Sequence, residues 1–307
     1  MLSTGDFLNL STVAYDANTT SSLPLLTSTG YNLLLRTSDV FSSTYACDGL
    51  EALAAYNSSN NHLIIAISGS SYYGLNTNLL DLDLDLLNDY ALIQDKLPPQ
   101  HSFAITFINT AISKIPAQLK KITFTGHSLG ASLTELAAAD FLAQGKYDID
   151  GVTFDGPGTK PIFESQWPAI TTLAYNKIIT HLGAPNIVNT LNPQTGTLKQ
   201  LEYHGRNRFF NSAYKLYEND KLSVKVIEEM VITALTHDDP LFFYTPHQMV
   251  TFQSEMNAQT GEFLGEFEVP KWNQDYSRSA IMADITTILA DLGIPRLISL
   301  AQKVKSI

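Results

Sequence analysis

The sequence predicts an α/β fold in which helices cover both faces of a mainly parallel sheet. Apolar residues make up 44% of the 307 residues and charged residues only 16%, which supports a large buried core. The run HLIIAIS at residues 62–68 is continuously apolar, as is typical of a strand covered on both faces. Strand-like segments alternate with helical patterns along the chain, as they do in parallel sheets.

The individual elements follow from local patterns, taken in chain order. Polar residues at 57–61 predict a turn between two strands, and Gly145 stands where it can cap the end of a helix. Pro116 interrupts another helical pattern. Strands are expected at residues 31–36, 50–56, 62–68, 121–125, 150–154, 177–181 and 199–203. Helices are expected at residues 7–18, 101–120, 129–144, 224–235, 247–256, 278–291 and 296–305.

The overall charge and the chain ends limit the classes of partner. A formal net charge of −11 repels nucleic-acid phosphates, so nucleic-acid binding is not expected. The N-terminus lacks the basic and apolar regions of a Sec signal peptide, and no apolar run is long enough to span a membrane. We therefore expect a soluble protein, either cytoplasmic or exported by a route that is independent of a signal peptide. We expect a main domain at residues 1–270 and a helical segment at 271–307 that docks on it or touches a membrane surface.

Metal and disulfide chemistry have little support. Cys47 is the single cysteine, so the chain can form no internal disulfide and no cysteine-based metal site. The acidic run LLDLDLDLLND at residues 79–89 favours a solvated edge or loop. A calcium loop of the EF-hand type would need a glycine after the third aspartate, where Leu86 stands. We expect neither a metal ion nor a cofactor.

The stretch KITFTGHSLGA at residues 121–131 places a serine at the join of a predicted strand and a predicted helix. A serine hydroxyl acts as a nucleophile only from a fixed, exposed position beside a base. Gly126 and Gly130 lack Cβ atoms, which lets the strand and the helix approach each other around Ser128. The amide of Leu129 lies at the helix N-terminus, which favours negative charge. The pattern predicts a nucleophile elbow with Leu129 as an oxyanion donor; the alternative is a turn whose serine caps the helix.

An oxyanion hole needs a second donor, which usually comes from the loop after an earlier strand. The apolar strand at residues 62–68 is followed by Gly69 and Ser70. Ser70 is therefore the candidate for the second donor. The alternative is an ordinary Gly-Ser turn.

The pairing of HLIIAISGSS with ITFTGHSLGASLTELAA resembles the class 3 lipase family of α/β-hydrolases. Members of that family carry a buried strand, a Gly-Thr or Gly-Ser oxyanion loop and then GHSLGA. The resemblance covers residues 50–192 and, more loosely, the region around His247. It implies an α/β-hydrolase fold and an esterase, lipase or phospholipase that needs no cofactor. The chain departs from the family at Ser68, where an arginine is usual, and at residues 181–192, which hold no acid where the family has an aspartate.

The missing acid leaves two candidates for the third member of a catalytic triad. Asp155 follows the predicted strand at residues 150–154, so it stands at the carboxyl end of a strand. Asn186 stands where the family's aspartate would be, and it can orient a histidine but adds no charge. We favour Asp155; the alternative reading of that residue is a turn aspartate that caps the next segment.

The catalytic base is expected in a late loop that precedes a helix. His247 fits this position, because residues 244–246 break the chain and a helical pattern follows. His237 and His204 are the alternatives. The order Ser128, Asp155, His247 is the order of the α/β-hydrolase triad.

These residues predict hydrolysis of a carboxylic ester through an acyl-enzyme. Apolar residues at 71–80 and 241–244 favour long acyl chains, and the first of these segments forms a lid or packs into the core. Phospholipids or lysophospholipids are the first choice of substrate and neutral glycerides the second, presented at a membrane or micelle surface. Two alternatives stay open: a catalytically inactive lipase-like protein that binds lipid or a partner, and an esterase or thioesterase that acts on a soluble substrate.

Overall fold

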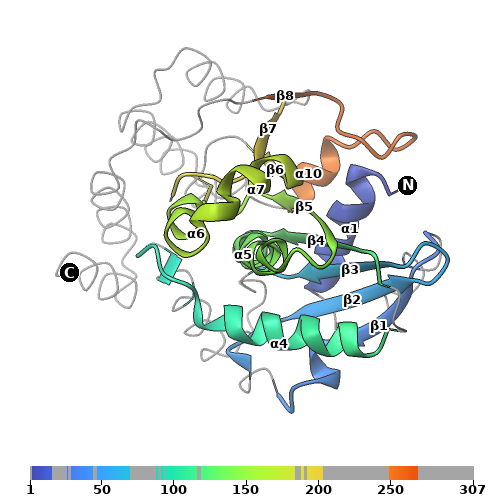
Figure 1. Ribbon diagram of the computed structural model, residues 1–307. Helices are drawn as coiled ribbons and strands as arrows, with labels where there is room; N and C mark the ends of the chain where they lie inside the picture. The colour runs from blue at the N-terminus through green and yellow to red at the C-terminus, as the bar shows by residue number, and fades with distance from the viewer. Residues whose placement is uncertain are drawn as a thin grey trace, which may run out of the picture.

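Eight strands form one sheet, in which each strand lies beside the strands that precede and follow it in the sequence (Figure 1). A computed structural model describes residues 2–15, 26, 29–43, 47–69, 88, 91–92, 94–115, 119–183, 188–189, 192–202 and 249–268. The strands are β1 (Asn32–Arg36), β2 (Ala52–Asn57), β3 (His62–Ile67), β4 (Lys121–His127), β5 (Asp148–Phe154), β6 (Ile178–Leu182), β7 (Thr197–Leu201) and β8 (Glu266–Glu268).

The centre of the sheet is parallel and its edges are antiparallel. Strands β3 to β7 run in one direction, whereas β1 and β2 at one edge and β8 at the other pair antiparallel. The prediction of a mainly parallel sheet is therefore confirmed. Because the five central strands share a direction, the loops that follow them gather at one end of the sheet, where α/β proteins hold their active sites.

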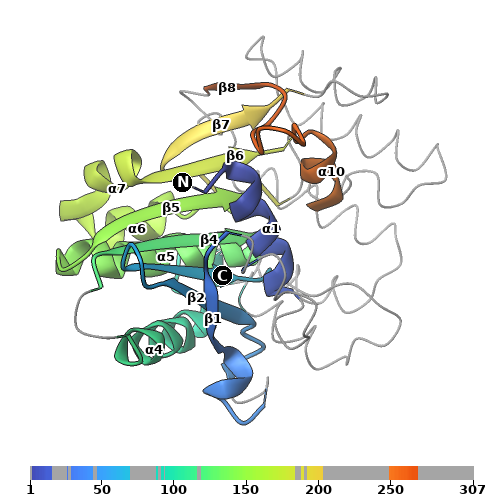
Figure 2. The same cartoon turned by 90° about the vertical axis from the view of Figure 1, so that its right-hand side faces the viewer.

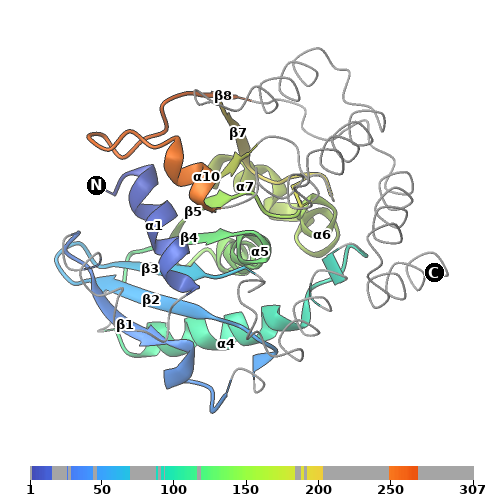
Figure 3. The same ribbon diagram turned by 180° about the vertical axis from the view of Figure 1, so that it is seen from behind.

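Helical layers cover both faces of the sheet, as Figure 2 shows from the side. Four helices share one large apolar core with the sheet, and two helices pack on the other face. From behind, those two helices lie side by side (Figure 3). The first layer consists of α4 (Pro99–Ser113), α5 (Leu129–Gln144), α6 (Lys160–Gln166) and α7 (Thr171–Lys177). The second consists of α1 (Thr4–Ala14) and α10 (Met249–Ser254).

The packing of β3 on both faces explains why its sequence is a continuous apolar run. Leu63 and Ile65 belong to the core beneath α4 and α5, whereas Ile64 and Ala66 belong to the core beneath α1. Successive side chains of a strand point to opposite faces, so a strand with helices on both sides needs apolar residues at every position. The prediction of a doubly covered strand at residues 62–68 is confirmed.

Most predicted elements are present with small shifts of their ends. Helix α5 has the predicted bounds, and Gly145 caps it in the left-handed conformation with φ of +62°. Helix α1 begins three residues earlier than predicted, because Ser3 and Asp6 form a capping box. Strand β4 continues two residues further than predicted, to His127. The structure also contains elements that were not predicted, namely α6, α7, β8 and two short 3-10 helices at Thr37–Asp39 and Pro168–Ile170.

Several predicted features lie outside the described residues. These are the helices at residues 224–235, 278–291 and 296–305, the acidic run at 79–89 apart from Asn88, the segments at 71–80 and 241–244, and the segment 271–307. Within the described part of the chain, no helix is long and apolar enough to cross a membrane. The same described residues contain no cluster of side chains that could hold a metal ion.

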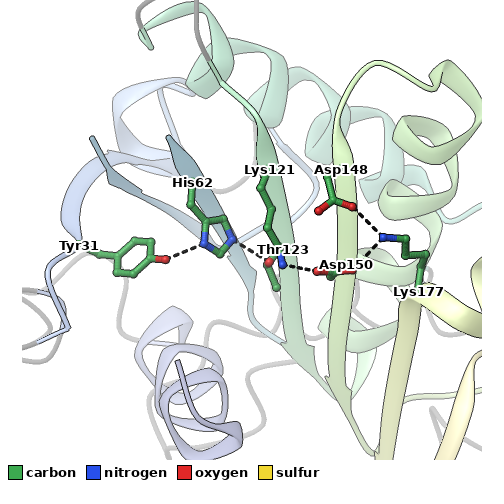
Figure 4. A network of polar contacts seen from close by, with 7 residues as sticks. All are labelled: Tyr31, His62, Lys121, Thr123, Asp148, Asp150 and Lys177. Carbon is green, nitrogen blue, oxygen red and sulfur yellow. Dashed lines mark hydrogen bonds and ion pairs between the residues drawn. The ribbon is translucent and has the colours of Figure 1, made fainter. Parts of the chain in front are cut away.

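A chain of polar contacts joins neighbouring strands at their amino ends, far along the strands from the loops that follow them (Figure 4). The Tyr31 hydroxyl lies 2.6 Å from His62 Nδ1, and His62 Nε2 lies 2.8 Å from the Thr123 hydroxyl. Burial, followed by the nearby positive charge of Lys121, lowers the pKa of His62 to about 4. The chain of contacts continues through ion pairs among Lys121, Asp150, Lys177 and Asp148.

Candidate active site

Ser128 stands at a sharp turn between β4 and α5. Its φ of 59° and ψ of −134° lie in a region that non-glycine residues rarely adopt. It is the N-cap residue of α5, yet its side chain makes no capping hydrogen bond to the helix. A serine recruited as a cap would make that bond. The alternative of a helix-capping serine is therefore wrong, and capping does not account for the strained turn.

The glycines on either side of Ser128 are required by close contacts. A Cβ atom on Gly126 would lie 2.4 Å from the backbone oxygen of Gly130, and one on Gly130 would lie 2.2 Å from the oxygen of Ile67. Both distances are far shorter than any real Cβ contact, and both partners are backbone atoms that cannot rotate away. The first turn of α5 therefore lies directly against β4 and β3, as the nucleophile-elbow prediction requires.

The loop that follows β3 reaches the same point. A Cβ atom on Gly69 would lie 2.6 Å from Ser128 Cβ and 2.7 Å from the oxygen of His127. Ser68, which stands where the related family has an arginine, donates its amide and hydroxyl to the oxygen of Glu51 at 3.0 and 3.2 Å. Ser70 lies outside the described residues. The chain that leads to it passes in contact with Ser128.

The amide of Leu129 is the first of α5. The first four amides of a helix have no partner within the helix, and the positive end of the helix dipole lies beside them. Leu129 thus stands where the sequence placed the first oxyanion donor.

Asp155 lies at the end of the neighbouring strand β5 and is fully buried. Its φ is 52°, so Ser128 and Asp155 both have a positive φ at the ends of adjacent strands. The Ser128 amide donates to the oxygen of Phe154 at 3.0 Å, which ties the elbow to the residue before Asp155. The Asp155 amide donates to the oxygen of His181 at 2.8 Å. Backbone bonds therefore hold both residues in one frame.

The carboxylate of Asp155 is oriented by donors from the loop after β6. The amide of Gly183 and the side-chain amide of Asn189 each donate to Asp155 Oδ1 at 2.7 Å. The side-chain amide of Gln194 in turn donates to the oxygens of Gly156 and Asn189, at 2.9 and 2.8 Å. Two charge-assisted bonds on one oxygen fix the direction of the carboxyl group. Asp155 therefore does more than cap the segment that follows it, because its carboxylate binds donors from a different loop.

Asn189 and Gly183 are residues of the candidate site that the sequence did not reveal. They belong to the segment at residues 181–192, which contains no acid. The structure gives the segment a role as a source of hydrogen-bond donors to the acid of the preceding strand. Asn186, the other candidate for the third triad member, lies outside the described residues.

The three candidate bases, His247, His237 and His204, also lie outside the described residues. Helix α10 begins two residues after His247, and its Phe252 packs against His127 and Phe154, with ring centroids 6.2 and 6.1 Å apart. His127 and Phe154 immediately precede Ser128 and Asp155. Helix α10, which begins two residues after His247, therefore contacts the residues that precede Ser128 and Asp155.

A buried acid lies behind the elbow on α5. Glu135 accepts hydrogen bonds from the hydroxyls of Thr153 on β5, Thr180 on β6 and Thr159 at the start of α6. Burial raises the pKa of the Glu135 carboxyl to about 7, although the three hydroxyl donors act in the opposite direction. The contacts join α5, which begins directly after Ser128, to β5 and β6, which end directly before Asp155 and Gly183.

Residues 103–181 match the model of the family described as Lipase (class 3). The match runs from α4 to β6 and includes both Ser128 and Asp155. A protein of Rickettsia prowazekii (strain Madrid E), described as the uncharacterized protein RP165, is 26% identical over 188 residues. That alignment covers 56% of this chain and 48% of the relative, so the chain spans about half the length of the relative.

Among solved structures, the Lip2 lipase from Yarrowia lipolytica superimposes with a TM-score of 0.44 at 13% identity, over 65% of this chain and 77% of that one. Lipase II from Rhizopus niveus gives a TM-score of 0.40 at 12% identity, over 65% of this chain and 80% of that one. The chain's own sheet, elbow and helical layers form an α/β-hydrolase fold. The resemblance to class 3 lipases is thus confirmed by the family match at residues 103–181, the part of the chain that carries the predicted nucleophile elbow.

Proposed function

We propose that this protein is a serine hydrolase that cleaves carboxylic esters of lipids through a triad of Ser128, Asp155 and His247. The observation that carries the proposal is the strained turn at Ser128, whose side chain does not cap the helix that it begins. Strain of this kind costs about 1–3 kcal/mol, and it persists where the surrounding structure requires it, most often at active sites. The match to the class 3 lipase family over this region supports the same conclusion.

In the proposed reaction, Ser128 Oγ attacks the ester carbonyl carbon while the His247 imidazole takes the hydroxyl proton. The tetrahedral intermediate collapses, the carbon–oxygen bond to the alcohol breaks, and the imidazolium returns its proton to the leaving alcohol. Water then attacks the acyl-enzyme, assisted by the same histidine, and releases the carboxylic acid. The amides of Leu129 and Ser70 are the proposed donors to the oxyanion in both steps.

The assignment of His247 rests on the position of α10. Two residues of chain span at most about 7 Å, so His247 is tied closely to Met249 at the start of that helix. Met249 packs on an apolar cluster that includes Phe154, the residue before Asp155. His204 follows Leu201 of the same cluster by three residues, so the choice of His247 over it rests on the expected place of the base, in a late loop before a helix.

The donors to Asp155 weaken the alternative of an inactive, lipid-binding protein. That alternative is based on the lack of an acid at residues 181–192. The same segment supplies Gly183 and Asn189, which hold the Asp155 carboxylate. An acid with two dedicated donors, one strand away from the elbow, fits an acid that orients a histidine.

Lipid esters are the proposed substrates, with phospholipids or lysophospholipids first and neutral glycerides second. The support is the apolar character of residues 71–80 and 241–244 in the sequence, together with the family match. We expect the substrate to be presented at a membrane or micelle surface. No cofactor takes part in the proposed reaction.

The test is to measure hydrolysis of acetyl, butyryl, octanoyl and palmitoyl esters, and of phosphatidylcholine micelles, by wild type and Ser128→Ala. We expect the rate of hydrolysis to rise with acyl length and to rise again above the concentration at which the substrate forms micelles. We expect kcat to fall about 10⁴-fold or more in Ser128→Ala. A preference for acetyl esters without a micelle effect would instead assign a soluble esterase. Full activity of Ser128→Ala would exclude the mechanism.

A further inference from the structure

Tyr15, at the C-terminal end of α1, lies at the candidate active site although it is 113 residues from Ser128 in sequence. Its hydroxyl is 2.8 Å from His127 Nδ1, and the two rings pack at a centroid distance of 6.0 Å. His127 is the residue immediately before the candidate nucleophile, and its side chain is buried. Tyr15 therefore contacts the elbow through a hydrogen bond and through ring packing.

The same hydroxyl also lies against the loop that follows β3. A Cβ atom on Gly69 would be 2.4 Å from Tyr15 Oη and 2.6 Å from Ser128 Cβ. Since both atoms are that close to one point, they can be no further apart than the sum of the two distances, 5.0 Å. Tyr15 Oη, Gly69 and Ser128 thus occupy one small volume, with Ser70 as the next residue of the loop.

The register of α1 on β4 fixes this position. The hydroxyls of Ser11 and Thr125 lie 2.9 Å apart in the core between the helix and the strand. Four residues of helix advance about 6 Å and two residues of strand about 6.6 Å. A helix locked at Ser11–Thr125 therefore brings Tyr15 level with His127. The contact between Ser11 and Thr125 thus sets the position of Tyr15 relative to β4.

We propose that Tyr15 is a positioning residue, whose hydroxyl holds the residue before the nucleophile and the residue before the second oxyanion donor in one fixed arrangement. This inference rests on the function proposed above and adds a residue to its machinery. Oxyanion donors stabilise the transition state only when they are already in place, so a loop that moves loses that stabilisation without losing substrate binding. The role predicts an effect on kcat rather than on KM.

The test compares Tyr15→Phe with Tyr31→Phe. Both tyrosines pair their hydroxyl with the Nδ1 atom of a histidine, but Tyr31 pairs with His62 at the amino ends of the strands (Figure 4). Each variant removes one hydroxyl and keeps the ring. For hydrolysis of an octanoyl ester, we expect Tyr15→Phe to lower kcat about 10-fold with KM within about twofold. We expect Tyr31→Phe to leave both constants within about twofold of wild type.

A second measurement separates this inference from the proposed function. The rate at which a fluorophosphonate modifies wild type and each variant is followed by intact mass, with melting temperatures recorded in parallel. The expected result is slower modification of Tyr15→Phe alone, by a factor similar to the loss of kcat. Wild-type rates in Tyr15→Phe, or equal losses in both variants, would overturn the role of Tyr15 while the hydrolase stands. A wild type that neither reacts nor hydrolyses the ester would overturn the function and this role together.

Discussion

At the scale of single residues, the candidate site contains two strained positions at the ends of adjacent strands. Ser128 and Asp155 both have positive φ, and backbone bonds through Phe154 and His181 hold them. The sequence could predict both residues, because each follows a recognisable strand. It could not predict Asn189 or Tyr15, since their contacts depend on how a loop and a distant helix pack, which no local pattern records.

The identity of the third triad member gives a prediction at this scale. Asp155→Asn keeps the size of the side chain but removes the charge that stabilises an imidazolium ion, so we expect kcat to fall about 10³–10⁴-fold. Asn186→Ala is the control and should stay within a few-fold of wild type. Steady-state kinetics on an octanoyl ester provide the comparison. A small effect at Asp155 with a large one at Asn186 would reverse the assignment.

At the scale of elements, the site depends on the close approach of α5 to β3 and β4. Small residues at Gly126 and Gly130 allow that approach. The sequence predicted the bounds of α5 and its capping glycine, because a long helix with a clear stop signal is read locally. The short helices α6 and α7 were missed, since segments of seven residues offer too few turns for a helical period to emerge.

Gly130→Ala tests the approach of the helix to the sheet. The new methyl group would meet the backbone oxygens of Ile67 and Ser68 at 2.2 and 2.4 Å, so we expect a loss of about 3 kcal/mol in the free energy of unfolding. Gly145→Ala is the matched control, because a Cβ atom there meets nothing within 4 Å and only the left-handed φ is unfavourable. Its expected cost is about 1 kcal/mol. Equal losses in urea denaturation would show that space around Gly130 is not limiting.

Glu135 makes the contact between α5 and its neighbouring strands sensitive to pH. The pKa of its carboxyl is about 7 in the folded protein and has an ordinary value of 4.5, so the folded state binds more protons between these pH values. Stability from this group is present below about pH 4.5 and is lost as the pH rises through about 7. Glu135→Gln stays neutral, so it should lose less stability than wild type between about pH 5 and about pH 8. Urea denaturation measures this, and the exposed Glu164→Gln should follow wild type.

At the scale of the whole molecule, the two ends of the parallel strands have different tasks. The carboxyl ends carry Ser128 and Asp155, and the amino ends carry the polar contacts of Figure 4. Alternation of strand and helix patterns was enough to predict the sheet and its covering layers. The edge strand β8 was not predictable, because three residues with glutamates at both ends carry no strand signal. Its partner β7 is what makes it a strand.

The amino ends give a pH prediction of the opposite sign. The pKa of His62 is about 4 in the folded protein against an ordinary value of 6.5, so the unfolded state binds more protons between these pH values. Stability from this group is present above about pH 6.5 and is lost as the pH falls towards about 4. His62→Gln cannot take up this proton, so its free energy of unfolding should fall less than that of wild type between about pH 6.5 and about pH 4.5. Identical slopes for the two proteins would contradict the burial of a neutral His62.

We propose that Ser128 is an activated nucleophile, and intact-mass analysis after treatment with a fluorophosphonate tests this role. Wild type, Ser128→Ala and His247→Ala are treated with and without detergent micelles. We expect one adduct on wild type, none on Ser128→Ala, and strongly slowed formation on His247→Ala, because the serine then lacks its base. An adduct that persists in Ser128→Ala, or a wild type that stays unmodified in both conditions, would contradict it.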